Sequence, residues 1–263
     1  MTTLSILVIA LYLLASLAAL QQLLTERTGG RWPLWTLVGS ALGLHLLLLF
    51  NEITALETGQ DLSLIKVASA VSWLVSLLLT LLCRRLNGGI LLPVAYGFAI
   101  LLLLVNYLIP GQYVIHLEHH PLVLLHIALA LSSYAVLLIA SLFTLLLAYL
   151  DHHLKQRKRV AIPGLPPLLT LEHRVMQLIG LGIALLTLSI GSGWLFLTDP
   201  FSPLSSMKAG LSLVAWCLYV TLLWGHHYQG WRGKTLILFS LLGSALLTLA
   251  YFGSRVIIEV LLA

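Results

Sequence analysis

The sequence predicts an all-α protein, a polytopic membrane helix bundle of about eight transmembrane helices with both termini on the periplasmic side. Hydrophobic residues make up 60% of the 263 residues and charged residues only 9%, whereas soluble domains carry about 25% charged residues. Apolar stretches reach the roughly 20 residues that cross a bilayer, and they recur along the whole chain. These observations exclude a water-soluble domain.

Eight apolar stretches define the expected spans. The first has no basic residue before it and no small-residue cleavage site after it, which favours a retained helix over a signal peptide. The fifth is longer than a bilayer requires, so we expect it to tilt or to project into the cytoplasm. The spans lie near residues 4–24, 33–51, 63–83, 90–109, 121–150, 172–197, 208–226 and 235–258.

One long loop interrupts the apolar pattern at 151–170. It combines a charge run, Lys155 to Arg159, with three prolines, which restrict the backbone and disfavour a continuous helix. We therefore predict a single membrane domain over 1–263, in which a cytoplasmic linker (151–170) separates five helices (4–150) from three (172–258).

The basic residues occur mainly in alternate loops, which predicts the orientation. Only Lys66, Lys208 and Arg255 lie in the other set of loops or at its helix ends. The positive-inside rule assigns the richer set to the cytoplasm and both termini to the periplasm of a bacterial inner membrane. The net charge of +5 thus reflects topology, and no nucleic-acid partner is expected. The cytoplasmic set comprises Arg27, Arg31, Arg84, Arg85, Lys155, Arg157, Lys158, Arg159, Arg174, Arg232 and Lys234.

Histidines are the main chemical signal. The chain has ten, but only His45 and His126 fall inside expected spans, where ionisable side chains face a partner, a cavity or a cofactor. Both are expected within roughly 10 Å of the outer end of their span, given a rise of 1.5 Å per residue. A third candidate, His116, lies in the outer loop before Pro121.

Two readings of His45 and His126 stay open at this point. Two neutral imidazoles at one depth can bind haem iron from opposite faces, or each histidine can simply hydrogen-bond a neighbouring helix. A zinc site would need three or four clustered ligands, which the spans do not supply. His116 is the alternative outer axial ligand, although the HLEHH sequence around it also fits a solvated interfacial loop.

Three stretches carry a family resemblance: HIALALSSY at 126–134, KAGLSLVAW at 208–216, and GWRG at 230–233 followed by YFGS at 251–254. The first is similar to a family helix in which a haem-ligating outer histidine precedes a tyrosine by eight residues. The second matches the end of a tryptophan-rich haem-handling segment. The chain thereby resembles the cytochrome c assembly family, which includes the System II haem synthetases, their System I relatives and the HemX-like proteins.

The resemblance implies a non-covalent b-type haem held in the outer half of the bundle. It makes His126 an expected axial ligand of the iron. His45 is expected to be the second ligand because of its depth, with His116 as the alternative because it lies on the outer side. Lys208 and Arg255 are expected to neutralise the haem propionates, although Arg255 also fits an i,i+4 pair with Glu259. Trp194 and Trp216 complete the candidate cofactor-binding residues, since Trp216 has the spacing of the tryptophan-rich segment.

The sequence also departs from the family pattern. Where the synthetases have Trp-Asp-Pro-Lys-Glu-Thr-Trp, residues 203–211 read PLSSMKAGL, and no histidine follows Tyr251. Trp224 stands where the synthetases have a histidine. These departures favour haem binding without ligation of haem to apocytochrome.

The alternatives are a structural or regulatory membrane subunit with a vestigial haem site and a small-molecule transporter. A transporter is expected to show broken, charged helices in repeated halves. No constellation of hydrolytic residues occurs at a common depth, so no enzyme activity is assigned. The expected partners are membrane lipid, haem and other membrane or cytochrome-maturation proteins.

Overall fold

The computed structural model describes eight helices that are long and apolar enough to cross a membrane. This confirms the predicted class of an all-α polytopic helix bundle. The fifth helix runs over Pro121–Lys155, or 35 residues, which corresponds to about 52 Å and far exceeds a hydrocarbon core of about 30 Å. The described residues are 2–25, 31–54, 60–85, 89–108, 114–115, 121–156, 167–196 and 203–253.

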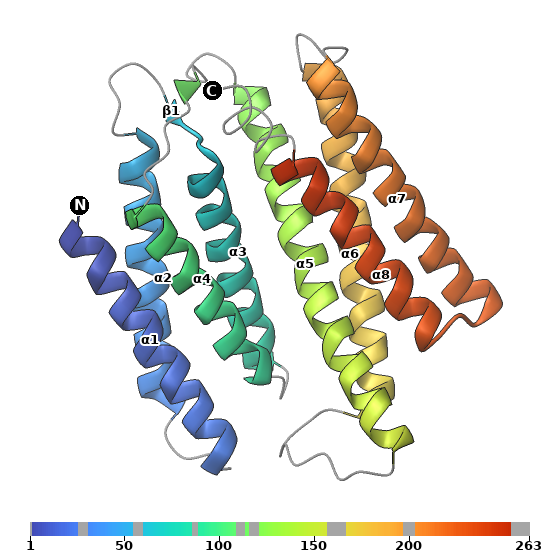
Figure 1. The fold of residues 1–263 in the computed structure, drawn as a ribbon, viewed down its shortest axis with the longest axis horizontal. Coiled ribbons are helices and arrows are strands. Elements are labelled where there is room, and N and C mark those ends of the chain that lie inside the picture. The colour runs from blue at the N-terminus through green and yellow to red at the C-terminus, as the bar shows by residue number, and fades with distance from the viewer. Residues whose placement is uncertain are drawn as a thin grey trace. The chain divides into compact units, whose positions relative to one another are not determined.

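The first compact unit contains the first four long helices. Each helix packs against the next, and α1 also packs against α4, so the four helices form a closed ring (Figure 1). A two-stranded antiparallel pair joins two of the connections, with Gln60 opposite Ile115. The elements are α1 (Thr2–Thr25), α2 (Arg31–Thr54), β1 (Gln60–Asp61), α3 (Leu64–Arg85), the 3-10 turn η1 (Gly89–Leu91), α4 (Leu92–Leu108) and β2 (Val114–Ile115).

The second compact unit contains the other four long helices. They also form a ring, in which α5 packs against α6 and α8, and α7 against α6 and α8. The fifth helix therefore groups with the three helices that follow the 151–170 linker; that the whole chain is one domain stays a prediction. The elements are α5 (Pro121–Lys155), α6 (Leu168–Phe196), α7 (Pro203–Gln229), α8 (Lys234–Thr248) and the π-helical turn η2 (Leu249–Gly253).

Many large apolar side chains point away from their own unit, as expected of a protein whose solvent is lipid. Leu17 on α1 and Leu188 on α6 are 61% and 58% exposed. Inside unit 2, Gly182 on α6 faces the Leu137 side chain on α5, and a Cβ at Gly182 would overlap it. Close approach of two helices at a small residue is the packing device that membrane helices commonly use.

The orientation of the chain stays a prediction, and reporter fusions test it. A reporter fused after Ala263 is expected to be active on the periplasmic side, and one inserted near Lys158 on the cytoplasmic side, because of the basic-residue distribution. The two fusions control for each other. Exchanged activities would show that the predicted orientation is inverted.

Candidate functional site

His126 lies on α5, five residues after the helix begins, and its ring faces α6. Its Nδ1 lies 2.9 Å from the Ser189 carbonyl oxygen and 3.0 Å from Ser192 Oγ. A carbonyl oxygen only accepts hydrogen bonds, so Nδ1 carries the proton and donates it. The neutral ring then keeps its lone pair at Nε2. At that atom the structure records no hydrogen bond with any residue that it describes.

Small residues of α6 make room for this imidazole. A Cβ added to Gly193 would lie 2.9 Å from His126 Cε1, so the ring rests against bare backbone. The Ser192 hydroxyl also donates to the Ser189 carbonyl oxygen, at 2.9 Å. The serines and the glycine thus fix both the position and the tautomer of the ring. Such orientation by a second residue is what metal-ligating histidines generally require.

An aromatic cluster lies close to Ser189 in the second compact unit. The centroid of the Tyr134 ring on α5 lies 5.2 Å from that of the Tyr251 ring and 5.8 Å from that of the Phe252 ring of η2, with the rings tilted in both pairs. The Tyr134 hydroxyl is 2.9 Å from Thr248 Oγ1. The Tyr251 hydroxyl lies close to the Ser189 side chain. Ser189 therefore accepts a hydrogen bond from His126 through its carbonyl group and lies beside the aromatic cluster.

The π-helical turn η2 contributes Tyr251 and Phe252 to this aromatic cluster. Turns of this type widen a helix by one residue and frequently occur at functional sites. Here the widened turn, Leu249–Gly253, carries both Tyr251 and Phe252 toward α5. The tyrosine eight residues after His126, quoted for the family resemblance, thus packs in the core beside the end of α8.

His45 has a different environment, inside unit 1. It is fully buried, its Nδ1 lies 3.1 Å from the Tyr12 hydroxyl, and its Nε2 lies 3.0 Å from Ser69 Oγ. Both ring nitrogens are therefore used in hydrogen bonds to neighbouring helices. The Tyr12 ring also packs against Tyr96 at 5.7 Å.

A row of buried hydroxyls on α3 extends this polar core. Ser69, Ser72, Ser76 and Thr80 follow each other at helical spacing on one buried face. Thr80 Oγ1 is 2.8 Å from the Tyr96 hydroxyl, which links α3 to α4. The interior of unit 1 is thus held together partly by interhelical hydrogen bonds, with His45 at its centre.

The remaining predicted site residues lie in various places. Lys208 is half-buried in α7, and Trp194, near the end of α6, is 70% exposed. Trp216 donates its Nε1–H to Thr187 Oγ1 at 2.8 Å, which ties α7 to α6. His116 and Arg255 lie outside the described residues. Because His45 belongs to unit 1 and His126 to unit 2, their pairing at one iron stays a prediction.

The residues that position His126 were not predicted as part of a site. Ser189, Ser192 and Gly193 place small or polar groups at spacings of three and four on one face in the second half of α6, where most other residues are apolar. That pattern is the signal that identifies the partner of an intramembrane histidine. Within the described part of the chain, no three His, Cys, Asp or Glu side chains cluster as a metal-binding group.

The fold, the buried His45 and the half-buried His126 define a multi-pass helical membrane protein with polar contacts inside each of its two units. Comparison with known proteins gives the family. The family model described as cytochrome C assembly protein matches residues 34–262, and the chain belongs to this family, as its sequence motifs predicted.

Two relatives add to this result. The chain is 38% identical over 245 residues, which cover 92% of it and 93% of the relative, to the inner membrane protein YpjD of Escherichia coli strain K12. It is 30% identical over 141 residues, or 52% of each chain, to an uncharacterized 28.8 kDa protein of Azospirillum brasilense. No solved structure gives a significant match. With its eight spans, the chain is a multi-pass protein of the bacterial inner membrane.

Proposed function

We propose that this protein binds a non-covalent b-type haem and that His126 Nε2 is an axial ligand of the iron. The observation that carries the proposal is the hydrogen bond from His126 Nδ1 to the Ser189 carbonyl oxygen at 2.9 Å. It leaves a lone pair at Nε2 on a ring whose orientation is set by the protein. The family, whose description names cytochrome c assembly, supports a role in handling haem.

The chemistry of the surrounding residues fits such a group. A neutral imidazole is the common proximal ligand of haem iron, and hydrogen bonding at its second nitrogen raises its basicity. Tyr134, Tyr251 and Phe252 pack as an aromatic cluster close to the same helices. Haem bound here would supply a redox-active iron centre, or would itself be held as cargo. The chain's own contribution is to hold and orient the ligand in a water-poor environment.

The second axial ligand is proposed to be His45, with His116 as the alternative. Ligation by His45 requires it to give up one of its two hydrogen bonds, to Tyr12 or to Ser69. Interhelical hydrogen bonds in membrane proteins contribute about 0.6 kcal/mol each on average. A single lost bond of that size is small beside the free energy of an iron–imidazole bond.

The direct test is to purify the full-length protein in mild detergent and to record its absorption spectrum with a pyridine-haemochrome assay. We expect about one b-type haem per chain and a six-coordinate, bis-histidine spectrum. A folded protein that stays free of haem even after expression with added haem would contradict the proposal. The alternative, a structural or regulatory membrane subunit with a vestigial site, would then stand.

Replacing Lys208 by alanine is expected to weaken haem retention while leaving the ligand spectrum unchanged. An ammonium group near the outer surface neutralises a propionate without touching the iron, and one such interaction contributes on the order of 1 kcal/mol. Haem dissociation to an acceptor protein measures the effect, and we expect about fivefold faster loss. Lys155→Ala, at the far end of α5, is the control. Unchanged retention in Lys208→Ala would make Lys208 an interfacial anchor only.

The protein is also expected to interact with other membrane or cytochrome-maturation proteins, since haem that is bound as cargo must be delivered to a partner protein. The departures from the synthetase pattern at 203–211 and at Trp224 argue against ligation of haem to apocytochrome by this chain itself.

A further inference from the structure

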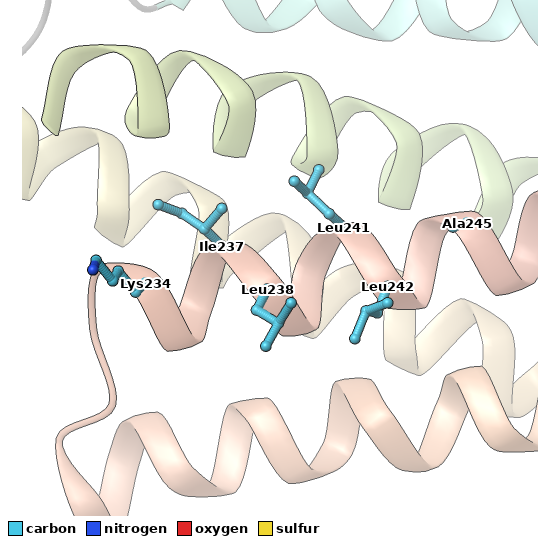
Figure 2. A pocket seen from close by; sticks show the side chains of 6 residues that line it. All are labelled: Lys234, Ile237, Leu238, Leu241, Leu242 and Ala245. Carbon is cyan, nitrogen blue, oxygen red and sulfur yellow. The ribbon is translucent and has the colours of Figure 1, made fainter. Parts of the chain in front are cut away.

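An elongated hollow of about 590 Å³ follows one side of α8. Its lining residues recur at spacings of three and four, so they share one face of the helix. Figure 2 shows them in a row, with Lys234 at one end and Ala245 at the other. The lining consists of Lys234, Ile237, Leu238, Leu241, Leu242 and Ala245.

This groove is open to the surroundings of the helix. Leu238 and Leu242 are 56% and 47% exposed, although they are large apolar side chains. Lys234 is the only charged residue of the lining, and α8 contains no acidic residue. Arg232, two residues before the helix, has a side chain that is 65% exposed, but its Nε lies 3.7 Å from the Glu172 carboxylate, so its charge is paired. The groove thus offers hydrocarbon along its length and positive charge at one end.

The dimensions of the groove match one leaflet of a bilayer. Eleven residues separate Lys234 from Ala245, which is about 16 Å along the helix axis. Half of a hydrocarbon core of about 30 Å is 15 Å. An acyl chain that starts at the headgroup level beside Lys234 therefore ends near Ala245, where the small side chain leaves room.

We propose that this groove binds an anionic phospholipid, with its phosphate at Lys234 and one acyl chain along Leu238, Leu242 and Ala245. Charge complementarity selects an anion at the basic end, and the apolar lining selects a hydrocarbon tail. A polar or peptide ligand finds no hydrogen-bonding side chain beyond Lys234 in the lining. By the predicted orientation the lipid belongs to the cytoplasmic leaflet, whose anionic surface attracts such basic residues. The site is independent of haem.

The test is native mass spectrometry of the full-length, delipidated protein titrated with phosphatidylglycerol or phosphatidylcholine. Wild-type protein is expected to bind one phosphatidylglycerol more tightly than phosphatidylcholine. One basic residue near a membrane surface contributes about 1 kcal/mol, which is about fivefold in affinity. Lys234→Gln is therefore expected to weaken phosphatidylglycerol binding about fivefold and to leave phosphatidylcholine binding unchanged. Lys155→Gln, which removes an exposed charge from α5, is expected to change neither.

A second pair of variants tests the apolar part of the groove without touching its charge. Ala245→Leu adds bulk at the end of the groove opposite Lys234 and is expected to weaken the binding of both lipids severalfold. Ala184→Leu makes the same change at an exposed position of α6 and is expected to have no effect.

Three outcomes would overturn the proposal. The first is equal binding of the two lipids by the wild-type protein, and the second is an equal loss in Lys234→Gln and Lys155→Gln. The third is a dimer that Ala245→Leu disperses while lipid binding stays unchanged. In that case a second copy of the chain covers this face of α8.

Discussion

Replacing His126 by alanine is expected to remove nearly all bound haem from the purified protein. Removing a residue that only hydrogen-bonds and orients a metal ligand weakens metal binding about 10–100-fold. Loss of the ligand itself is therefore expected to weaken haem retention by at least on the order of 100-fold. The haem-to-protein ratio from the pyridine-haemochrome assay measures the effect.

Two further variants separate ligation from packing at this position. His126→Gly, with its small cavity, is expected to recover haem when free imidazole is added, because imidazole restores the missing nitrogen. Ser192→Ala leaves the Ser189 carbonyl as an acceptor for Nδ1 and is expected to weaken haem retention by less than tenfold.

The matched control is His227→Ala. His227 is exposed near the end of α7, where its Nδ1 bonds the Leu223 carbonyl, and its loss is expected to leave haem content unchanged. If His126→Ala keeps its haem and its six-coordinate spectrum, His126 is a packing residue. The family resemblance would then describe a shared fold without the shared function.

Replacing His45 by alanine is expected to produce the largest loss of stability. The two hydrogen bonds to Tyr12 and Ser69 contribute roughly 0.6 kcal/mol each, so the cavity left in a fully buried site makes the larger contribution. Together they amount to about 2–4 kcal/mol, or a fall of roughly 5–10 °C in the thermal unfolding midpoint. A fluorescence-detected thermal scan in detergent measures this shift.

Tyr12→Phe is the matched control for the hydrogen bond alone. It removes the hydroxyl that bonds His45 Nδ1 but keeps the ring that packs against Tyr96. The thermal unfolding midpoint of Tyr12→Phe is expected to fall by only about 1–3 °C. Equal shifts in the two variants would show that hydrogen bonding, and not packing, dominates the contribution of His45.

The same His45→Ala variant tests the second axial ligand. If His45 binds the iron, its haem is expected to be lost or to become five-coordinate, and added imidazole is expected to restore the six-coordinate spectrum. If His45→Ala keeps a full six-coordinate spectrum while His116→Ala loses it, His116 is the second ligand. The stability shift of His45→Ala is expected in either case, so the two roles are distinguishable.

The sequence alone determined the number and class of the helices. Long apolar stretches leave few alternatives in a membrane, because every backbone polar group there must be satisfied within its own helix. All eight predicted spans correspond to helices of the structure. The sequence also separated His45 and His126 from the other histidines by their position inside spans, and its motifs indicated the family that the comparisons confirmed.

Only the tertiary structure decided what these histidines contact. Ser189 and Ser192 are 63 and 66 residues from His126, and Tyr12 is 33 residues from His45. The tertiary structure also decided that α5 packs with α6 and α8 in one unit. The physical reason is that a helix which is apolar on all sides has no polar face to indicate its inward direction. Its rotation and its neighbours are set by close packing at small residues such as Gly182 and Gly193, which apolar periodicity does not report.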